Sequence, residues 1–247
     1  MKKAVVTLLL LLPVASLAAQ DIFEMAEHGT PAQVSAALSQ GANVNAKDPK
    51  GWTPLMHAAW LTMDDRVISA LVSAGARVDE TDKKGETALL IASRANVRPQ
   101  VVRALLAAGA SVNLMSKEGE TPLMAAAAEN SNPDVAKVLM SHGAQVDAKN
   151  ADGMTPLMLA AMLNGNRRMI TALVAGGARV NERGPDGKTS LMYAAQFTAS
   201  PEVVSALLAA GADRTLKSAG GLTAWDYARA NASLAGTSVP RVLRPGR

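Results

Sequence analysis

The sequence predicts an all-α fold, a solenoid of helix-turn-helix units with projecting hairpin loops. The phrase GMTPLMLAA at Gly153 returns in related form at Gly51, Gly85, Gly119 and Gly187. These glycines are 34 residues apart, and a second series of Gly-Ala pairs keeps the same interval. The chain is 49% hydrophobic but only 3% aromatic, which suits small, closely packed helices. A period of this length indicates stacked supersecondary units.

The first 19 residues have the anatomy of a secretory signal peptide. Lys2 and Lys3 form a positive end, an apolar stretch follows, and Ser16-Leu17-Ala18-Ala19 offers small residues to a peptidase. An uncleaved membrane anchor is the alternative, but the apolar stretch is short for a bilayer span of ~20 residues and contains Pro13. We therefore expect cleavage after Ala18 or Ala19, no stable membrane anchor afterwards, and a periplasmic location. The chain has no cysteine and so forms no disulfide.

The first helix of each unit is predicted to begin at the Thr of the repeated phrase. In the unit at Gly51, Thr53 is a good N-cap, and Pro54 occupies the first helical position, where its missing N–H costs nothing. The helix then runs through Leu55, Ala58 and Ala59, which are small enough for close approach to neighbouring helices.

A second helix is predicted to follow a short turn. Apolar residues recur in it at helical spacing, as in Val101, Val102, Leu105 and Leu106, and it ends at the Gly of the Gly-Ala pair. A polar segment such as NVNAKDPKG then leads to the next phrase as a hairpin loop. The predicted N-cap positions of the second helices are Thr30, Asp64, Arg98, Asn132, Asn166 and Ser200, five of which are good capping residues.

The consensus G-x-TPLM-x-AA…VV-x-LL-x-x-GA-x-VN resembles the ankyrin repeat, whose signature carries T-P-L-H-x-A over about 33 residues. The resemblance covers essentially the whole chain after the leader and implies an ankyrin-repeat solenoid of about seven units including caps. The expected domains are a signal peptide (1–19), an ankyrin repeat domain (20–232) and a C-terminal tail (233–247). The expected units are 20–50, 51–84, 85–118, 119–152, 153–186, 187–220 and 221–232.

The sequence departs from the family signature where the family has a histidine. That position holds Met56, Leu90, Met124, Met158 and Met192, so the Thr–His hydrogen bond that the resemblance implies is replaced here by apolar packing. The same methionines suggest a copper site, but neighbouring helices lie ~8–10 Å apart, too far for one metal to collect their sulfurs.

No pattern in the chain indicates catalysis, a metal or another cofactor. His28, His57 and His142 have no second ligand at metal spacing, and neither a G-x-S-x-G elbow nor a phosphate loop occurs. Without the five basic residues near the two ends, 20 basic residues face 21 acidic ones, which gives little support to nucleic-acid binding. We therefore expect a protein that is not an enzyme, with an unrecognised active site as the alternative.

The resemblance implies that a partner protein is held on the concave side, by the hairpin tips and the exposed face of the first helices. Aromatic residues, Met and Arg are enriched where proteins bind proteins, and several fall on these columns. Covering of a helix turn is the alternative role for Trp60 and Phe197. The candidate partner-binding residues are Trp52, Trp60, Leu61, Lys83, Lys84, Arg94, Met115, Met154, Met162, Leu163 and Phe197.

The sequence therefore predicts an exported, monomeric protein-binding module whose partner is a periplasmic protein. An inhibitor or immunity-type protein that neutralises an enzyme is one such role. An accessory factor that supports a periplasmic enzyme or envelope protein is the other.

Overall fold

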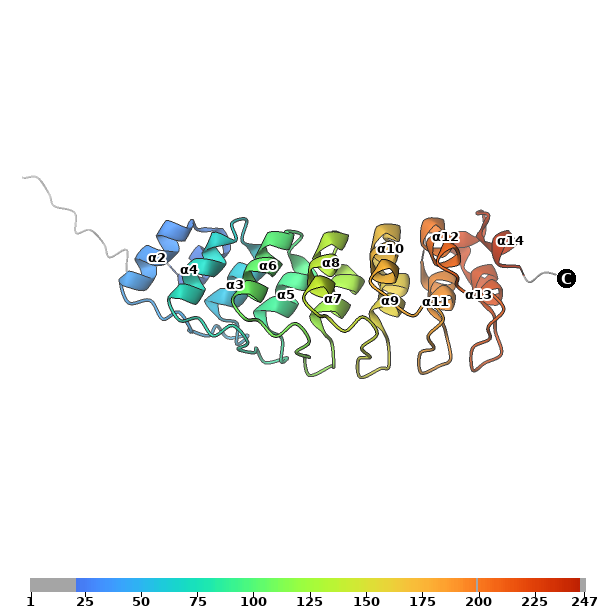
Figure 1. Cartoon of the computed structure of the whole chain (residues 1–247), viewed down its shortest axis with the longest axis horizontal. Coiled ribbons are helices and arrows are strands. Elements are labelled where there is room, and N and C mark those ends of the chain that lie inside the picture. Colours follow the sequence, from blue (N-terminus) through green and yellow to red (C-terminus); the bar gives the residue numbers. More distant parts are fainter. Residues whose placement is uncertain (1–20, 199, 245–247) are drawn as a thin grey trace, which may run out of the picture.

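The computed structural model describes residues 21–198 and 200–244, and these form one elongated stack of helix pairs (Figure 1). The second helices of the units form one row, the first helices form a parallel row, and the hairpin loops project together along one edge (Figure 1). The described part of the chain contains helices and turns but no strand, as predicted. The ends of this part lie at opposite ends of the stack.

The helix pairs follow the predicted 34-residue period. The first helices are α1 (Ile22–His28), α3 (Pro54–Leu61), α5 (Ala88–Ala95), α7 (Pro122–Glu129), α9 (Pro156–Leu159), which continues as the π-helical turn η2 (Ala160–Asn164), α11 (Ser190–Phe197) and α13 (Ala224–Ala230). The second helices are α2 (Pro31–Ser39), α4 (Arg66–Ser73), α6 (Pro99–Ala107), α8 (Pro133–Ser141), α10 (Arg167–Ala175) and α12 (Pro201–Ala209). A 3-10 turn η3 (Ala232–Leu234) and α14 (Val239–Leu243) complete the described chain.

The repeated phrase starts the first helices as predicted. The Thr53 hydroxyl accepts a hydrogen bond from the backbone N–H of Met56, and Thr87, Thr121 and Thr155 do the same in the next three repeats. The Gly of the phrase is required by a close approach of backbone. At Gly119, φ is 73°, and a Cβ atom there would lie 2.8 Å from the Ala151 nitrogen of the next hairpin.

The caps of the second helices follow the prediction in part. Thr30, Asn132 and Asn166 each accept a backbone N–H of the first turn. Ser200 makes no such bond, because its hydroxyl donates to Glu202 Oε2 instead. Helix α4 begins one residue later than expected, with Asp64 accepting the N–H of Arg66.

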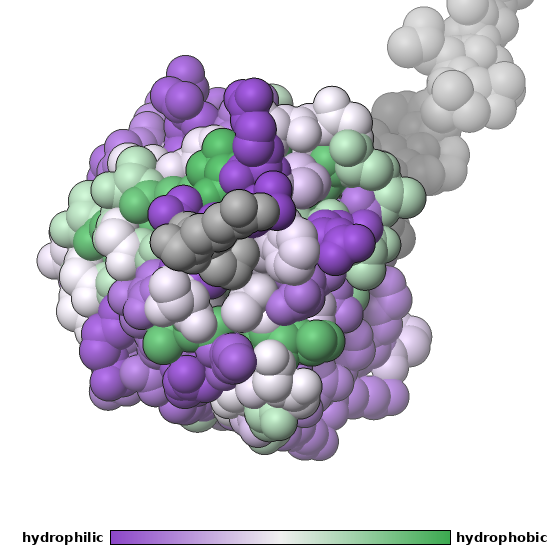
Figure 2. Space-filling model, turned by 90° about the vertical axis from the view of Figure 1, so that its right-hand side faces the viewer, coloured by the Kyte–Doolittle hydropathy of each residue, from purple (hydrophilic) through white to green (hydrophobic). Residues whose placement is uncertain are grey.

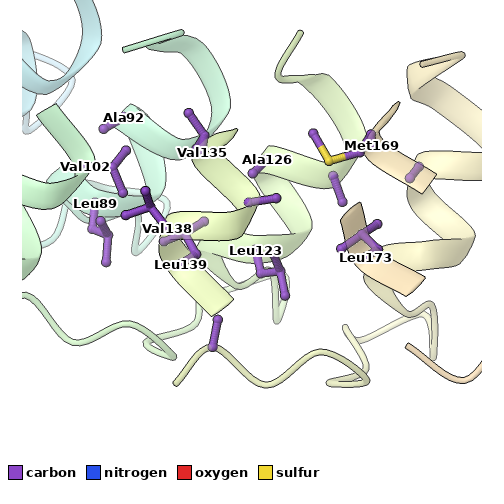
Figure 3. Packing of buried hydrophobic residues seen from close by; sticks show 14 of the residues in the cluster. Leu89, Ala92, Val102, Leu123, Ala126, Val135, Val138, Leu139, Met169 and Leu173 are labelled. Carbon is purple, nitrogen blue, oxygen red and sulfur yellow. The ribbon is translucent and has the colours of Figure 1, made fainter. Parts of the chain in front are cut away.

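The core runs without a break through the stack. In the central repeats, Leu89, Leu123 and Leu139 are fully buried between helices of adjacent units (Figure 3). The residues that replace the family histidine are buried as predicted, with exposed fractions of 0% for all five: Met56, Leu90, Met124, Met158 and Met192. Apolar packing therefore occupies this column.

Asparagine side chains join four of the units to the unit before them. The Asn96 amide donates to the carbonyl oxygens of Ala59 and Thr62, and Asn130 donates to those of Ser93 and Asn96. Asn164 and Asn231 repeat the arrangement further along the stack. Since these bonds span 33 to 37 residues, they fix the position of one repeat on the next.

The packed structure extends past residue 232, where the sequence placed a tail. Leu234, Val239 and Leu243 are buried against the last repeats, and Arg214 Nη1 donates to the carbonyl of Val242. Hydrophilic residues and small hydrophobic patches share this end of the molecule, with no continuous hydrophobic surface in view (Figure 2). Helix α14 therefore caps the stack.

The predicted signal peptide lies outside the described residues. Within 21–198 and 200–244, every helix is too short or too polar to cross a bilayer.

Candidate functional site: the first-helix face

The first helices and the hairpin loops share one surface, here called the first-helix face. It consists of the residue before each helix cap, the exposed end of each first helix, and the hairpin loop beneath. Because the repeats are 34 residues long, each position recurs as a column across the face. The columns differ from repeat to repeat, so the face is divided into an aromatic, an acidic and an apolar part.

The aromatic part lies at the N-terminal end of the face. The ring centroids of Trp52 and Trp60 are 5.6 Å apart in an edge-on arrangement, and Lys50 Nζ lies 5.6 Å from the Trp52 ring. Trp60 is 40% exposed. Trp52 is half-buried, and its indole N–H donates to Asp82 Oδ2 of the next hairpin at 3.0 Å. Trp52 therefore joins two repeats as well as contributing to the surface.

His57 packs against Trp52 and connects three elements. Its Nδ1 atom is 2.6 Å from Glu27 Oε1 of α1, and its Nε2 atom is 3.3 Å from Asp48 Oδ2 of the hairpin. Burial acts to raise the pKa of Asp48, but hydrogen bonds from the backbone of Trp52 and Lys50 and from His57 outweigh it and bring that pKa below 3.8.

The acidic part of the face surrounds Arg94 on α5. Its guanidinium bonds Glu86 Oε1 at 2.6 Å, Glu129 Oε1 at 3.1 Å, and Glu120 Oε2. Burial raises the pKa of Glu120 above its usual value in spite of Arg94, with further repulsion from Glu129 and Glu86. One guanidinium therefore serves three carboxylates.

A groove of about 430 Å³ runs from this cluster between the hairpins and the helix ends. Its wall includes the loop residues Glu118 and Asp152 and, on the helix side, the apolar Leu159 and Leu163. The full lining is Lys84, Glu86, Arg94, Ser116, Glu118, Glu120, Ala128, Glu129, Asn150, Asp152, Leu159 and Leu163.

The apolar part lies toward the C-terminal end. Leu163 is 58% exposed and Phe197 is 52% exposed, at equivalent positions of adjacent repeats. Beside them, Lys188 Nζ lies 5.4 Å from the Tyr193 ring and 5.3 Å from the Tyr227 ring, and 2.8 Å from Asp186 Oδ2. Burial and the Asp186 carboxylate raise the pKa of the Tyr193 phenol, so it stays protonated.

Most of the predicted partner-binding residues lie on the surface of this face. Trp60, Leu61, Met115, Leu163 and Phe197 are exposed apolar residues, and Lys83 and Lys84 are exposed at a hairpin. The Lys83 ammonium donates to the carbonyl of Pro49, so it also joins two loops. Arg94 and Met162 are half-buried.

The prediction for Met154 is wrong. Its side chain is only 7% exposed, because it packs into a small apolar cluster with Met124, Met158 and Tyr193. The equivalent Glu86 is also buried, at 6%, where it meets Arg94. This column precedes the helix cap and turns inward in the middle of the stack.

The change of sign along the hairpin tips was not predicted. Basic residues were expected there, whereas the acidic Glu118 and Asp152 line the groove. Aligning the residue before each phrase on the 34-residue period reveals the change, since the column runs Lys50, Lys84, Glu118, Asp152, Asp186. This tip position is therefore basic in the first two hairpins and acidic in the next three.

Nothing in the described ranges gathers three or more His, Cys, Asp or Glu side chains in a way that fits a metal ion. The groups on the face are instead suited to contact: exposed rings and aliphatic side chains beside charged residues. Such a mixture of apolar anchors with a polar surround is typical of surfaces that bind proteins.

The family model of ankyrin repeats (3 copies) matches residues 22–115, 62–150 and 123–218, so this chain belongs to the ankyrin repeat family. A solved structure, the ankyrin repeat domain of Bcl-3, described as a unique member of the IkappaB protein family, is similar with a TM-score of 0.70 and 26% identity. That match covers 87% of this chain and 96% of the other. A search of curated protein sequences found no significant match. Ankyrin repeats generally mediate protein–protein interaction, and the fold is typically not enzymatic.

Proposed function

We propose that this chain is an exported protein that binds a periplasmic partner protein through its first-helix face. The observation that carries the proposal is the row of exposed apolar residues at the ends of the first helices. Leu61, Leu163 and Phe197 are 36% to 58% exposed at equivalent positions of three repeats, and Trp60, next to Leu61, is 40% exposed. Large apolar side chains aligned on one face favour an interaction surface over scattered exposure.

Two roles fit such a surface. As an inhibitor or immunity-type protein, the chain would cover the active site of a periplasmic enzyme. As an accessory factor, it would hold a periplasmic enzyme or envelope protein in an active or stable state. The two differ in the effect on the captured partner, whose activity falls in the first case and is kept or raised in the second.

The test is capture of a partner from a periplasmic extract by the wild-type protein and by Trp60→Ala, Leu163→Ala and Phe197→Ala. Truncation of a central interface residue costs ~2 kcal/mol, so we expect an affinity about thirtyfold weaker for at least one variant, at an unchanged melting temperature. Trp52→Ala is a poorer probe because its indole bonds Asp82. Arg103→Ala, on the exposed side of α6, is the control. Full capture by all three variants would contradict the assignment of the face.

Export is tested separately. We expect the mature chain to begin at Ala19 or Gln20, and measuring the intact mass of the protein from a periplasmic fraction tests this. A full-length mass in the membrane fraction would contradict it.

A further inference from the structure

The groove of the first-helix face carries an excess of negative charge. Its lining contains five carboxylates, those of Glu86, Glu118, Glu120, Glu129 and Asp152, against the two cations Lys84 and Arg94. Arg94 is already bonded to three of the five. The groove therefore has three more carboxylates than cations, and acceptors to spare.

The spare acceptors are accessible. Glu129 is bonded to Arg94 through one oxygen, and its side chain remains 56% exposed. Glu118 and Asp152 lie on the loop side, are exposed, and form no ion pair with the part of the chain that the structure describes. A carboxylate offers about four acceptor sites, so each of these groups has room for a further donor.

The opposite wall of the groove is apolar. Leu163 projects at its edge with 58% of its surface exposed, next to Ala128 and Leu159, and Phe197 follows in the next repeat. A ligand that paired only with the carboxylates would leave these apolar side chains exposed to water. The groove thus joins two chemistries, carboxylates on the hairpins and at the end of α7, and apolar side chains at the helix end of the next repeat.

We propose that this groove takes a segment of the partner protein in which a lysine or arginine side chain stands beside a large apolar one. The inference rests on the proposed function and adds the chemistry of the partner. The basic side chain meets Glu118, Glu129 and Asp152, and the apolar one meets Leu163. An arginine suits the site well because its guanidinium can bond two carboxylates at once. The same charge repels a nucleic-acid backbone.

The test uses a probe that needs no knowledge of the natural partner. A library of random 12-residue peptides is displayed on phage and selected on the folded protein, and an enriched peptide is synthesised for affinity measurement. We expect enriched peptides with Lys or Arg next to Leu, Ile, Phe or Met. The double variant Glu129→Gln/Asp152→Asn should bind the peptide about tenfold or more weakly. The matched control Asp134→Asn/Glu202→Gln removes the same charge from the second helices and should bind as the wild type does.

Enriched peptides without basic residues, or equal binding by the double variant, would overturn the inference. The proposed function survives that result if Leu163→Ala or Phe197→Ala still weakens the neutral peptides, and fails together with the inference if neither does. The groove could also be filled by the basic C-terminal end of a second copy, which contains Arg241 and Arg244. If analytical ultracentrifugation showed a dimer, and the double variant Arg241→Ala/Arg244→Ala were monomeric, the occupant would be a second copy and the inference would be overturned.

Discussion

His57 joins the N-terminal unit to the first full repeat. It touches Glu27 on α1 and Asp48 in the hairpin, and its ring lies 5.0 Å from Phe23 and 5.3 Å from Trp52. The contacts cross from the capping unit to the first full repeat. Loss of either carboxylate therefore weakens the joint between them.

The lowered pKa of Asp48 predicts how the contact between the capping unit and the first full repeat responds to acid. Its pKa in the folded protein is below 3.8, so the folded state holds the proton less tightly than the unfolded chain does. The resulting stability is present above pH 3.8 and is lost as the pH falls through the lower folded pKa. We expect Asp48→Asn to reduce stability at neutral pH and to flatten the pH dependence below about pH 4. Hydrogen exchange of the α1 and α3 amides measures this, and identical slopes for variant and wild type would contradict it.

At the scale of elements, the starts of the first helices were predictable and the joints between repeats were not. Thr53 and its equivalents cap helices through contacts three residues away, so local sequence contains both partners. The hydrogen bonds of Asn96 and Asn130 join residues that are 34 to 37 positions apart. Local sequence patterns do not show which backbone carbonyl such an amide will meet. Met154 was placed on the surface because the family resemblance puts its column on the concave side, while its burial depends on Met124 and Tyr193 from neighbouring repeats.

Helix α14 shows the same limit. It has five residues and contains Pro240, too short a segment for a helical period to be visible. Its buried side is defined only by the repeats against which it packs. The sequence therefore assigned it to a tail, although Leu243 is fully buried.

Substitution in α14 tests its role as a cap. Leu243→Ala removes a fully buried side chain and should lower the free energy of unfolding by about 2–5 kcal/mol. Val242→Ala, one residue earlier and 44% exposed, is the matched control and should change it little. Equal small effects in a denaturant titration would mean that the stack does not depend on α14.

At the scale of the molecule, stability is the sum of repeats and of the contacts between neighbours. Leu105 on α6 is fully buried in the central part of the stack. We expect Leu105→Ala to lower the free energy of unfolding by about 2–5 kcal/mol and to raise hydrogen exchange most in the repeats on either side. Arg103→Ala, exposed on the same helix, is the control. Uniform acceleration of exchange from α1 to α14 would contradict this neighbour-by-neighbour account.

Because equivalent hydrogen bonds join successive repeats, whole repeats can be added or removed during evolution. Lys83 and Lys117 each donate to a carbonyl 34 residues earlier, and Asn130 donates to the carbonyl of Asn96 at the same separation. If residues 119–152 were excised as a block, Asn164 would meet the carbonyl of Asn96 just as it now meets that of Asn130. This asparagine bond would therefore form again at the new junction, whereas Arg94 would lose Glu120 and Glu129 as partners. Unequal recombination between copies of the repeat can therefore lengthen or shorten the gene by whole units, and excision of this particular block would remove Glu120, Glu129 and Asp152 from the acidic groove.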